Sequence, residues 1–236
     1  MANPYFRFKQ FTVYHDRCAM KVGTDGVLLG AWCDVANCKE AVDAGTGSGL
    51  IALMLAQRCS ANITGVEIDS PAAMQAAENV KLSPFAESVT IMHASFIEFA
   101  KEATGKYDLI VSNPPDFIAA LKPDNAARSL ARHTGEMDYE SLIESSCRLL
   151  SLSGRLALIL PYDHFDFFAQ LASEYGMSLC RKTLVYPKPE ASPKRILMEW
   201  KKTTCNCVED SLIIEIERHT YSDAFKQLTG NFYLDK

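Results

Sequence analysis

The sequence predicts an α/β fold in which a doubly wound, mostly parallel seven-stranded sheet carries an antiparallel strand near the C-terminus. Three observations support this fold class. Short apolar runs alternate with helix-forming runs from residue 40 onward, which is typical of a sheet covered by helices on both faces. The first of these apolar runs ends in a glycine-rich turn that leads into a helical run. After Gly176, two strand-like runs are joined by a proline-rich loop rather than by a crossover helix.

The elements follow from the spacing of apolar residues and from turn and cap residues. A short strand is expected near Phe6 and Phe8, and Thr24 or Asp25 can cap a helix over 27–32. Strands are expected near 41–44, 62–67, 88–92, 107–112, 154–160, 179–186, 195–200 and 211–217. Helices are expected near 48–59, 70–82, 95–102, 138–150, 163–175 and 222–229.

Length and composition indicate one globular domain over residues 1–236, with 48% apolar and 22% charged residues. The net charge of −5 provides no overall attraction to nucleic acid, so such a partner would need a local basic patch. No signal sequence and no apolar run of membrane-spanning length is present. The eight cysteines lack paired metal-ligand spacing, so plain thiols and no metal site are expected. The simplest interpretation is a reduced, cytoplasmic protein. A monomer is also expected.

A glycine-rich turn follows the strand at 41–44. The strand ends at Asp43, and Gly45, Gly47 and Gly49 alternate before an apolar helical run begins. Glycine tolerates positive φ and has no Cβ to keep a ligand away from the main chain. Glu67 ends the next strand, where its carboxylate can accept both hydroxyls of a ribose. Together these residues predict a site for a nucleoside-containing cofactor.

The glycine pattern leaves three interpretations open. A dinucleotide fingerprint can be fitted to residues 47–52, and the glycines could also form a plain structural turn. The better match is Asp-x-Gly-x-Gly-x-Gly, which resembles the glycine turn of S-adenosylmethionine (SAM) methyltransferases. SAM carries a cationic sulfonium and no pyrophosphate. Asp43 suits a ligand of that charge, whereas it would repel a pyrophosphate.

A second motif follows the strand at 107–112 and comprises Asn113, Pro114 and Pro115, with Asp116 and Phe117 behind them. Ligands bind outside the carboxyl ends of strands in doubly wound sheets, so this turn should face the glycine turn. It resembles the Asn-Pro-Pro-aromatic motif of methyltransferases that act on planar nitrogens. The Asn113 side-chain oxygen and the Pro114 carbonyl can accept the hydrogens of such an amine and free its lone pair, and Pro115 helps to fix that carbonyl. The alternative is a proline-rich loop in which Asn113 only caps the strand.

Two positions depart from the methyltransferase pattern. Asp116 occupies the place of an aromatic residue that would stack on the target base, so Phe117 is the expected substitute. Ser95 stands where relatives often carry an aspartate that binds the cofactor's adenine, and Ser95 can still accept one hydrogen bond.

Much of the chain resembles the bacterial tRNA1(Val) (adenine-N6) methyltransferase family. The segments that carry this resemblance are 8–11, 15–26, 28–32, 48–58, 221–224 and 232–234. It implies methylation of the adenine at position 37, next to the anticodon of a valine tRNA. It also implies an N-terminal segment, 1–33, that covers the cofactor, a catalytic core over 40–200 and a C-terminal extension over 201–236. The cofactor-binding residues expected from the motifs and the resemblance are Lys21, Thr24, Asp25, Gly26, Asp43, Gly45, Gly47, Gly49, Glu67, Ser95 and Asn113.

Basic residues cluster between 181 and 202, where seven lysines or arginines accompany two glutamates. The proline loop within this segment is a candidate phosphate-contact surface, with Lys188, Lys194 and Arg195. Arg128 and Arg132 follow the Asn-Pro-Pro turn and could hold phosphates beside the target. The alternative for such a charge run is a solvated face. His15 and Arg17 belong to the N-terminal segment that is expected to cover the cofactor. The alternative for these two residues is a surface ion pair with nearby acids.

Two rival functions remain. Methyltransferases that act on the glutamine amide of release factors share the Asn-Pro-Pro logic. They usually have a longer N-terminal helical domain, for which the residues before Asp43 leave no room. A SAM-binding protein that only interacts with RNA is the other alternative, and Asp116 is the residue that favours it.

Overall fold

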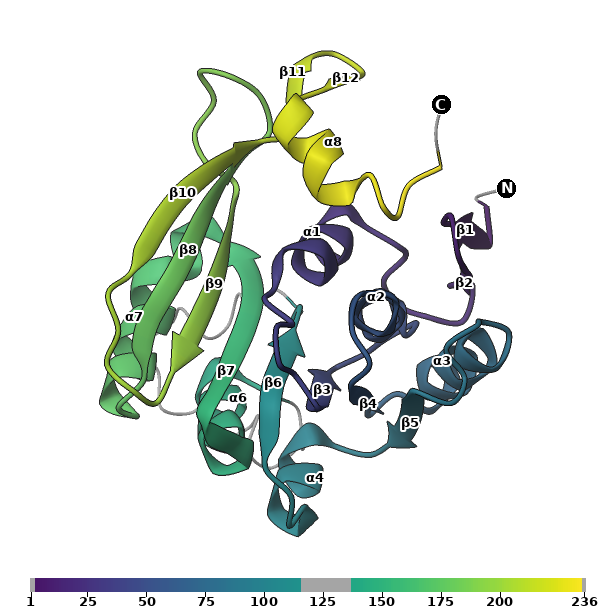
Figure 1. Ribbon diagram of the computed structural model, residues 1–236, viewed down its shortest axis with the longest axis vertical. Coiled ribbons are helices and arrows are strands. Elements are labelled where there is room, and N and C mark those ends of the chain that lie inside the picture. Colours follow the sequence, from purple (N-terminus) through teal and green to yellow (C-terminus); the bar gives the residue numbers. More distant parts are fainter. Residues whose placement is uncertain (1–2, 116–136, 235–236) are drawn as a thin grey trace.

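The computed structural model describes residues 3–115 and 137–234 (Figure 1). The strands of its main sheet are β3 (Glu40–Ala44), β4 (Asn62–Glu67), β5 (Val89–His93), β6 (Tyr107–Ser112), β7 (Leu150–Pro161), β8 (Ser178–Tyr186), β9 (Arg195–Lys201) and β10 (Val208–Ile213). Two small hairpins are formed by β1 (Tyr5–Arg7) with β2 (Thr12–Tyr14) and by β11 (Glu215–Glu217) with β12 (Thr220–Tyr221). The helices are α1 (Thr24–Trp32), α2 (Leu50–Arg58), α3 (Ser70–Lys81), α4 (Phe96–Glu102), α6 (Tyr139–Leu149), α7 (Phe165–Glu174) and α8 (Asp223–Thr229), with a 3₁₀ turn, η2, at Tyr162–His164.

The sheet has the strand order β10-β8-β9-β7-β6-β3-β4-β5. The chain winds outward from β3 through β4 to β5, and then from β6 outward through β7 in the other direction. The order therefore reverses between β3 and β6, which pair in parallel through Asp43 and Val111. Only β9 runs antiparallel to its neighbours among the described strands of this sheet. The predicted doubly wound α/β class is confirmed, and β3 and β6 mark its switch point.

The main sheet has eight strands rather than the predicted seven. Val208–Ile213 adds an eighth strand by pairing in parallel with β8. The expected strand at 211–217 instead divides into the end of β10 and the separate β11. The sequence gives little signal for this edge strand because its first four residues are exposed, and three of them are polar or charged. Backbone pairing with β8, the side-chain contacts of Glu209 and Asp210 with that strand, and the buried Leu212 hold it in place.

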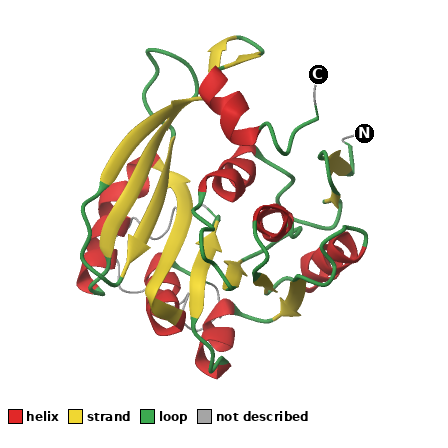
Figure 2. Cartoon of the chain, viewed as in Figure 1, coloured by secondary structure: helices red, strands yellow, loops and turns green. Residues whose placement is uncertain are grey.

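Alternate residues of each central strand face opposite sides of the sheet. On β6, Leu109 and Val111 pack with α1 and α2, whereas Ile110 packs with the buried side chains of α4, α6 and α7. Figures 1 and 2 show these two helical layers on opposite faces. The helices begin where local caps predict. Asp69 accepts the Ala72 amide at the start of α3, directly before Ser70 and Pro71.

The N-terminal hairpin is fixed beside the glycine turn by α3. Asn79 is fully buried, and its side chain accepts the Tyr14 amide (3.0 Å) while donating to the carbonyls of Tyr14 (2.8 Å) and Ser48 (2.9 Å). Arg17 forms an ion pair with Glu78, as the surface-pair interpretation expected. The same segment meets the C-terminal tail through a backbone hydrogen bond of 2.8 Å, so the two ends of the chain lie close together (Figure 1).

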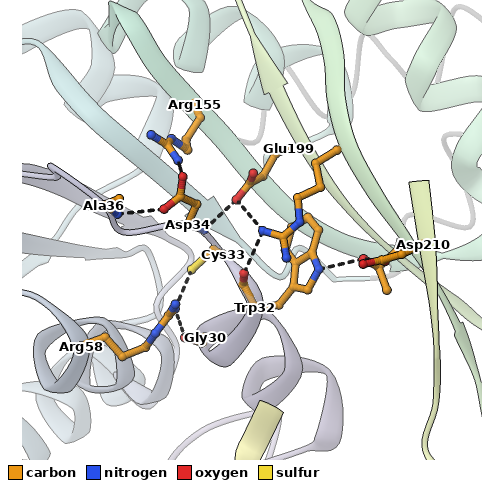
Figure 3. Close-up of polar contacts among 11 residues, drawn as sticks. Gly30, Trp32, Cys33, Asp34, Ala36, Arg58, Arg155, Glu199 and Asp210 are labelled. Atoms are coloured by element: carbon orange, nitrogen blue, oxygen red, sulfur yellow. Dashed lines mark hydrogen bonds and ion pairs between the residues drawn. The ribbon is translucent and has the colours of Figure 1, made fainter. Parts of the chain in front are cut away.

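Polar contacts attach the C-terminal end of α1 to the strands (Figure 3). The Trp32 indole N–H donates to the Thr183 hydroxyl at 2.8 Å. The Asp34 amide donates to Glu199 at 2.7 Å, and the Asp34 carboxylate pairs with Arg155. Glu199 is almost fully buried, so these bonds compensate for the loss of its hydration. They join residues that are more than a hundred positions apart and fix α1 against β7, β8 and β9.

The expectation of plain thiols is wrong at one pair. Cys180 on β8 and Cys205 in the β9–β10 loop form a disulfide, with Cα atoms 5.5 Å apart. Their separation of 25 residues spans a strand and two loops, which the cysteine spacing alone did not reveal. Six other cysteines are free. Within 3–115 and 137–234, no cluster of metal-ligating side chains is found, and no helix has the length and apolarity needed to cross a membrane.

Replacing Asn79 by Ala should lower the free energy of unfolding by about 2–3 kcal/mol, because it leaves partly buried backbone groups of Tyr14 and the buried carbonyl of Ser48 without this partner. Urea denaturation measures this change, and hydrogen exchange should accelerate at residues 12–17. Asn62→Ala is the matched control, since its exposed amide only donates to Glu40 and should change stability by less than about 0.5 kcal/mol. Equal effects of the two substitutions would contradict this role for Asn79.

Candidate active site

Two motifs meet at the carboxyl ends of β3 and β6. The glycine turn follows Ala44, and Asn113 follows Ser112. The Ser112 hydroxyl donates to the Ala44 carbonyl at 2.8 Å, and Ser112 is fully buried. This hydrogen bond joins the residues that immediately precede the two motifs. The predicted juxtaposition of the motifs is therefore present in the fold, at the switch point where doubly wound sheets bind ligands.

The glycine turn uses backbone conformations that favour glycine. Gly45, Gly47 and Gly49 have φ values of 74°, 55° and 82°. A Cβ on Gly47 would project into open space, whereas one on Gly49 would lie 3.4 Å from the Ala76 Cβ on α3. Gly49 thus allows α2 and α3 to approach, and Gly47 leaves room beside the main chain. That room is where a cofactor can contact the turn.

The buried carboxylate of Asp43 stabilises this turn by hydrogen bonds. Its carboxylate accepts the Thr46 hydroxyl (2.6 Å) and the Ala52 amide (3.1 Å) through Oδ2. The side chain is fully buried, and Oδ1 finds no hydrogen-bond partner among the described residues. Burial raises the pKa of Asp43 to about 7, with a smaller contribution from the Glu67 charge and against the two hydrogen bonds. The visible role of Asp43 is therefore to shape the turn, and its burial does not present the carboxylate to a ligand at the surface.

Glu67 lies at the end of β4 with its carboxylate against the glycine turn. Oε2 accepts the Gly47 amide at 2.8 Å, and Oε1 accepts the Asp69 amide at 2.9 Å. A carboxylate has further lone pairs, so these bonds orient Glu67 while leaving acceptor capacity for ribose hydroxyls. Ile68 beside it is 51% exposed and offers an apolar surface that the sequence analysis missed. Ser95, expected near the cofactor's adenine, is nearly buried at the start of α4.

The Asn-Pro-Pro turn is described as far as Pro115. Asn113 is partly exposed, Pro114 is buried and Pro115 is exposed. Asn113 can therefore be reached from outside while the following peptide is held against the protein. Phe117 and Asp116 lie outside the described residues, as do Arg128 and Arg132. Ser112 and Thr46 support these turns and were missed by the sequence analysis. The role of Ser112 depends on a contact between two strands, whereas Thr46 contacts Asp43 within the same turn, three positions earlier.

The predicted N-terminal cofactor residues occupy different environments. Lys21 and Thr24 are exposed. Gly26 is buried, and a Cβ there would lie 3.0 Å from Leu50 Cδ2, so this glycine permits close packing of α1 on α2. Asp25 accepts from Arg195 Nε at 2.7 Å. The structure thus joins a residue predicted for the cofactor to one predicted for the tRNA.

The basic segment does not form one continuous surface. Lys188 and Lys194 are exposed in the loop between β8 and β9, near Arg195 at the start of β9. Arg181 instead lies 3.9 Å from the centre of the Trp32 ring. Several other basic side chains of this segment contact groups of the protein itself or lie at the opposite end of β9 from the loop. These are Lys182, which pairs with Glu209, Lys202, which donates to the carbonyls of Cys147 and Leu150, and Lys201.

The raised pKa of Asp43 predicts a pH dependence of stability. An unfolded aspartate titrates near 3.8, whereas the folded carboxyl titrates near 7. Between these values the folded protein binds a proton that the unfolded chain has released, so this group lowers the free energy of unfolding as pH rises from 4 to 7. Asp43→Asn should remove the effect. The difference in unfolding free energy, variant minus wild type, should increase across this window in urea denaturation and level off above it. Parallel stability curves for the two proteins would contradict the pKa assignment.

Residues 26–165 match the family model of the methyltransferase small domain. A predicted O-methyltransferase from Agrobacterium tumefaciens aligns with a TM-score of 0.69 at 18% identity, over 88% of this chain and 96% of its own. A ribosomal protein L11 methylase from Lactobacillus delbrueckii subsp. bulgaricus aligns with a TM-score of 0.55 at 18% identity, over 76% of this chain and 77% of its own. These two likenesses show the fold.

Curated proteins are much more similar in sequence. A tRNA1(Val) (adenine(37)-N6)-methyltransferase from Phocaeicola vulgatus is 48% identical over 235 residues, which is 100% of both chains. Proteins of the same name from Aeromonas hydrophila and Flavobacterium psychrophilum are 45% and 44% identical. They cover 98% and 97% of this chain and 98% and 99% of their own. The resemblance drawn from the motifs is thereby confirmed, and the chain belongs to the tRNA1(Val) (adenine(37)-N6)-methyltransferase family.

Proposed function

We propose that the protein transfers a methyl group from SAM to the exocyclic N6 amine of the adenine at position 37 of tRNA1(Val). The observation that carries this proposal is the hydrogen bond between Ser112 and Ala44. It holds the glycine turn and the Asn-Pro-Pro turn at adjacent strand ends, which is the arrangement a methyl transfer between two bound molecules needs. Family membership supplies the reaction, and the geometry of the turns supports it.

The residues around the glycine turn fit SAM. Glu67 would accept the ribose hydroxyls, and the backbone of Gly45 and the open side of Gly47 would lie along the amino acid tail. Ile68 and Ser95 would border the adenine. The bound cofactor supplies an electrophilic methyl group on a cationic sulfonium. An acidic environment suits that charge. The Glu67 carboxylate would provide it against the turn, Asp43 would add to it from its buried position when ionised, and residues 45–49 include no basic side chain.

The Asn-Pro-Pro turn would activate the acceptor nitrogen. The lone pair of an adenine amine is delocalised into the ring, so the amine is a poor nucleophile until its two hydrogens are held by acceptors out of the ring plane. The Asn113 side-chain oxygen would accept one hydrogen and the Pro114 carbonyl the other. Consecutive prolines fix φ and keep this carbonyl in place. The chain would thus promote the reaction by positioning and hydrogen bonding rather than through a general base.

Further residues complete the proposal. Phe117 would stack on the target base in place of the aromatic residue that Asp116 replaces. Lys21, Thr24, Asp25 and Gly26 belong to the N-terminal segment, 1–33, which would cover the cofactor site of the core at 40–200. Lys188, Lys194, Arg195, Arg128 and Arg132 would contact tRNA phosphates.

The setting of the reaction completes the assignment. We take residues 1–236 to act as one catalytic domain, with 201–236 as an extension, and as a monomer in the cytoplasm, where its tRNA substrate is modified. Disulfides are rare in that compartment, so the Cys180–Cys205 disulfide is an exception to the usual pattern there. The pair lies at the amino ends of β8 and β10, away from the carboxyl ends that carry the glycine turn. The site therefore does not depend on this cross-link.

Transfer of labelled methyl from SAM to total tRNA from cells that lack the native enzyme should place label in N6-methyladenosine after digestion to nucleosides. Asn113→Ala should reduce this transfer by at least about a hundredfold, because the acceptor amine loses one of its two hydrogen-bond acceptors. Asn62→Ala, which changes an exposed asparagine at the opposite end of β4, should retain full transfer. Undiminished transfer by the Asn113 variant, or label found in a protein rather than in tRNA, would contradict the proposal.

A further inference from the structure

A cavity of about 420 Å³ lies beyond the carboxyl end of β7. One wall consists of residues 161–164, which end β7 and form η2, and the other consists of residues 193–195, which end the β8–β9 loop and begin β9. This loop projects beyond the sheet at the top of Figure 1. The volume lies within the range of sites for small ligands. Residues of the glycine turn and of the Asn-Pro-Pro turn are not part of its lining.

The two walls are fixed by the sheet itself. Pro161 pairs with Arg195 in the antiparallel ladder of β7 and β9. The Tyr162 amide donates to the Lys194 carbonyl at 3.2 Å, and the Lys194 amide donates to the Val185 carbonyl at 2.9 Å. Beneath them, the buried His164 is hydrogen-bonded to the Tyr139 hydroxyl at 2.7 Å. The cavity is therefore a preformed part of the fold.

The lining combines an aromatic ring with positive charge. Tyr162 is 41% exposed. Lys194 is exposed, and its ammonium forms no ion pair with the residues that the structure describes. Arg195 is held by Asp25 and by the Lys194 carbonyl, and Asp163 is the acid in the lining. An aromatic ring beside a free cation is the combination that binds single-stranded nucleotides, because the base stacks and the phosphate pairs.

The cavity is offset from the turn at which the methylated adenine is proposed to bind. β6 carries the Asn-Pro-Pro turn and pairs with β7 through Ser112 and Leu158. β7 continues for three further residues to Pro161, which places the cavity one strand away and roughly 10 Å further along the sheet. A nucleotide that neighbours the target in the same RNA strand could reach it while the target lies at Asn113.

We propose that this cavity binds a nucleotide adjacent to the methylated adenine, with its base stacked on Tyr162 and its phosphate paired with Lys194. The proposal rests on the function proposed above and adds the substrate contact that orients the anticodon loop. Arg195 would connect this nucleotide site to the N-terminal segment through Asp25.

Fluorescence anisotropy with a labelled anticodon stem-loop that carries adenine at position 37 tests the proposal. Tyr162→Ala should weaken binding about 5- to 100-fold, whereas Tyr162→Phe, which keeps the ring, should stay within about twofold of wild type. Lys194→Ala should reduce the slope of log affinity against log salt by about one. Lys101→Ala, which removes the same charge from exposed α4, should leave the slope unchanged.

Abasic substitutions in the stem-loop identify the stacked base. For the wild-type protein, removing one base next to position 37 should weaken binding of the stem-loop. For Tyr162→Ala, removing the same base should weaken binding no further, because the stacking contact is already lost. If that penalty is the same in both proteins at every position, Tyr162 does not stack and the inference is wrong. If the wild type methylates tRNA normally and neither the Tyr162 nor the Lys194 substitution changes binding, only this inference fails. If the wild type neither binds nor methylates tRNA, the proposed function fails with it.

Discussion

The hydrogen bonds that Asp43 accepts from Thr46 and Ala52 determine the course of the chain between β3 and α2. They bend three alternating glycines into positive-φ conformations around a carboxylate that water does not reach. Burial raises the pKa of this carboxyl to about 7, so the turn is maintained at the expense of a destabilised charge. Glycine adopts positive φ without strain, so the main chain of this turn can lie close to a bound ligand.

Neighbouring elements connect to this turn from three sides. The Gly45 and Thr46 amides donate to the Val66 carbonyl, and Glu67 accepts the Gly47 amide. Ser112 joins β6 to β3, and Asn79 joins α3 and the N-terminal hairpin to the carbonyl of Ser48. Each bond links elements that are distant in sequence. The proposed cofactor site and the proposed acceptor site are therefore one rigid unit, in which displacement of one strand end would move both.

Local motifs were predictable, and long-range contacts were not. The glycine turn, Glu67 and the Asn-Pro-Pro turn depend on residue types at short spacings, so their placement at strand ends followed from the sequence. The pairing of β10 with β8 was missed because an exposed edge strand lacks an apolar pattern. The disulfide at Cys180, the stacking of Arg181 on Trp32 and the cavity at Tyr162 likewise require the fold. Asp43 was predicted as a cofactor contact, and the fold adds that it is buried and hydrogen-bonded to Thr46 and Ala52.

The carboxyl ends of β3, β4 and β6 form the proposed cofactor site. Hydrogen exchange of the full chain with and without SAM measures this directly, because bound ligand slows exchange of the amides that it covers or orders. We expect slower exchange at residues 45–49 and 67–69, with no change in the edge strand β10 and the loop before it, residues 205–213. Protection at that distant edge, with residues 45–49 unchanged, would contradict it.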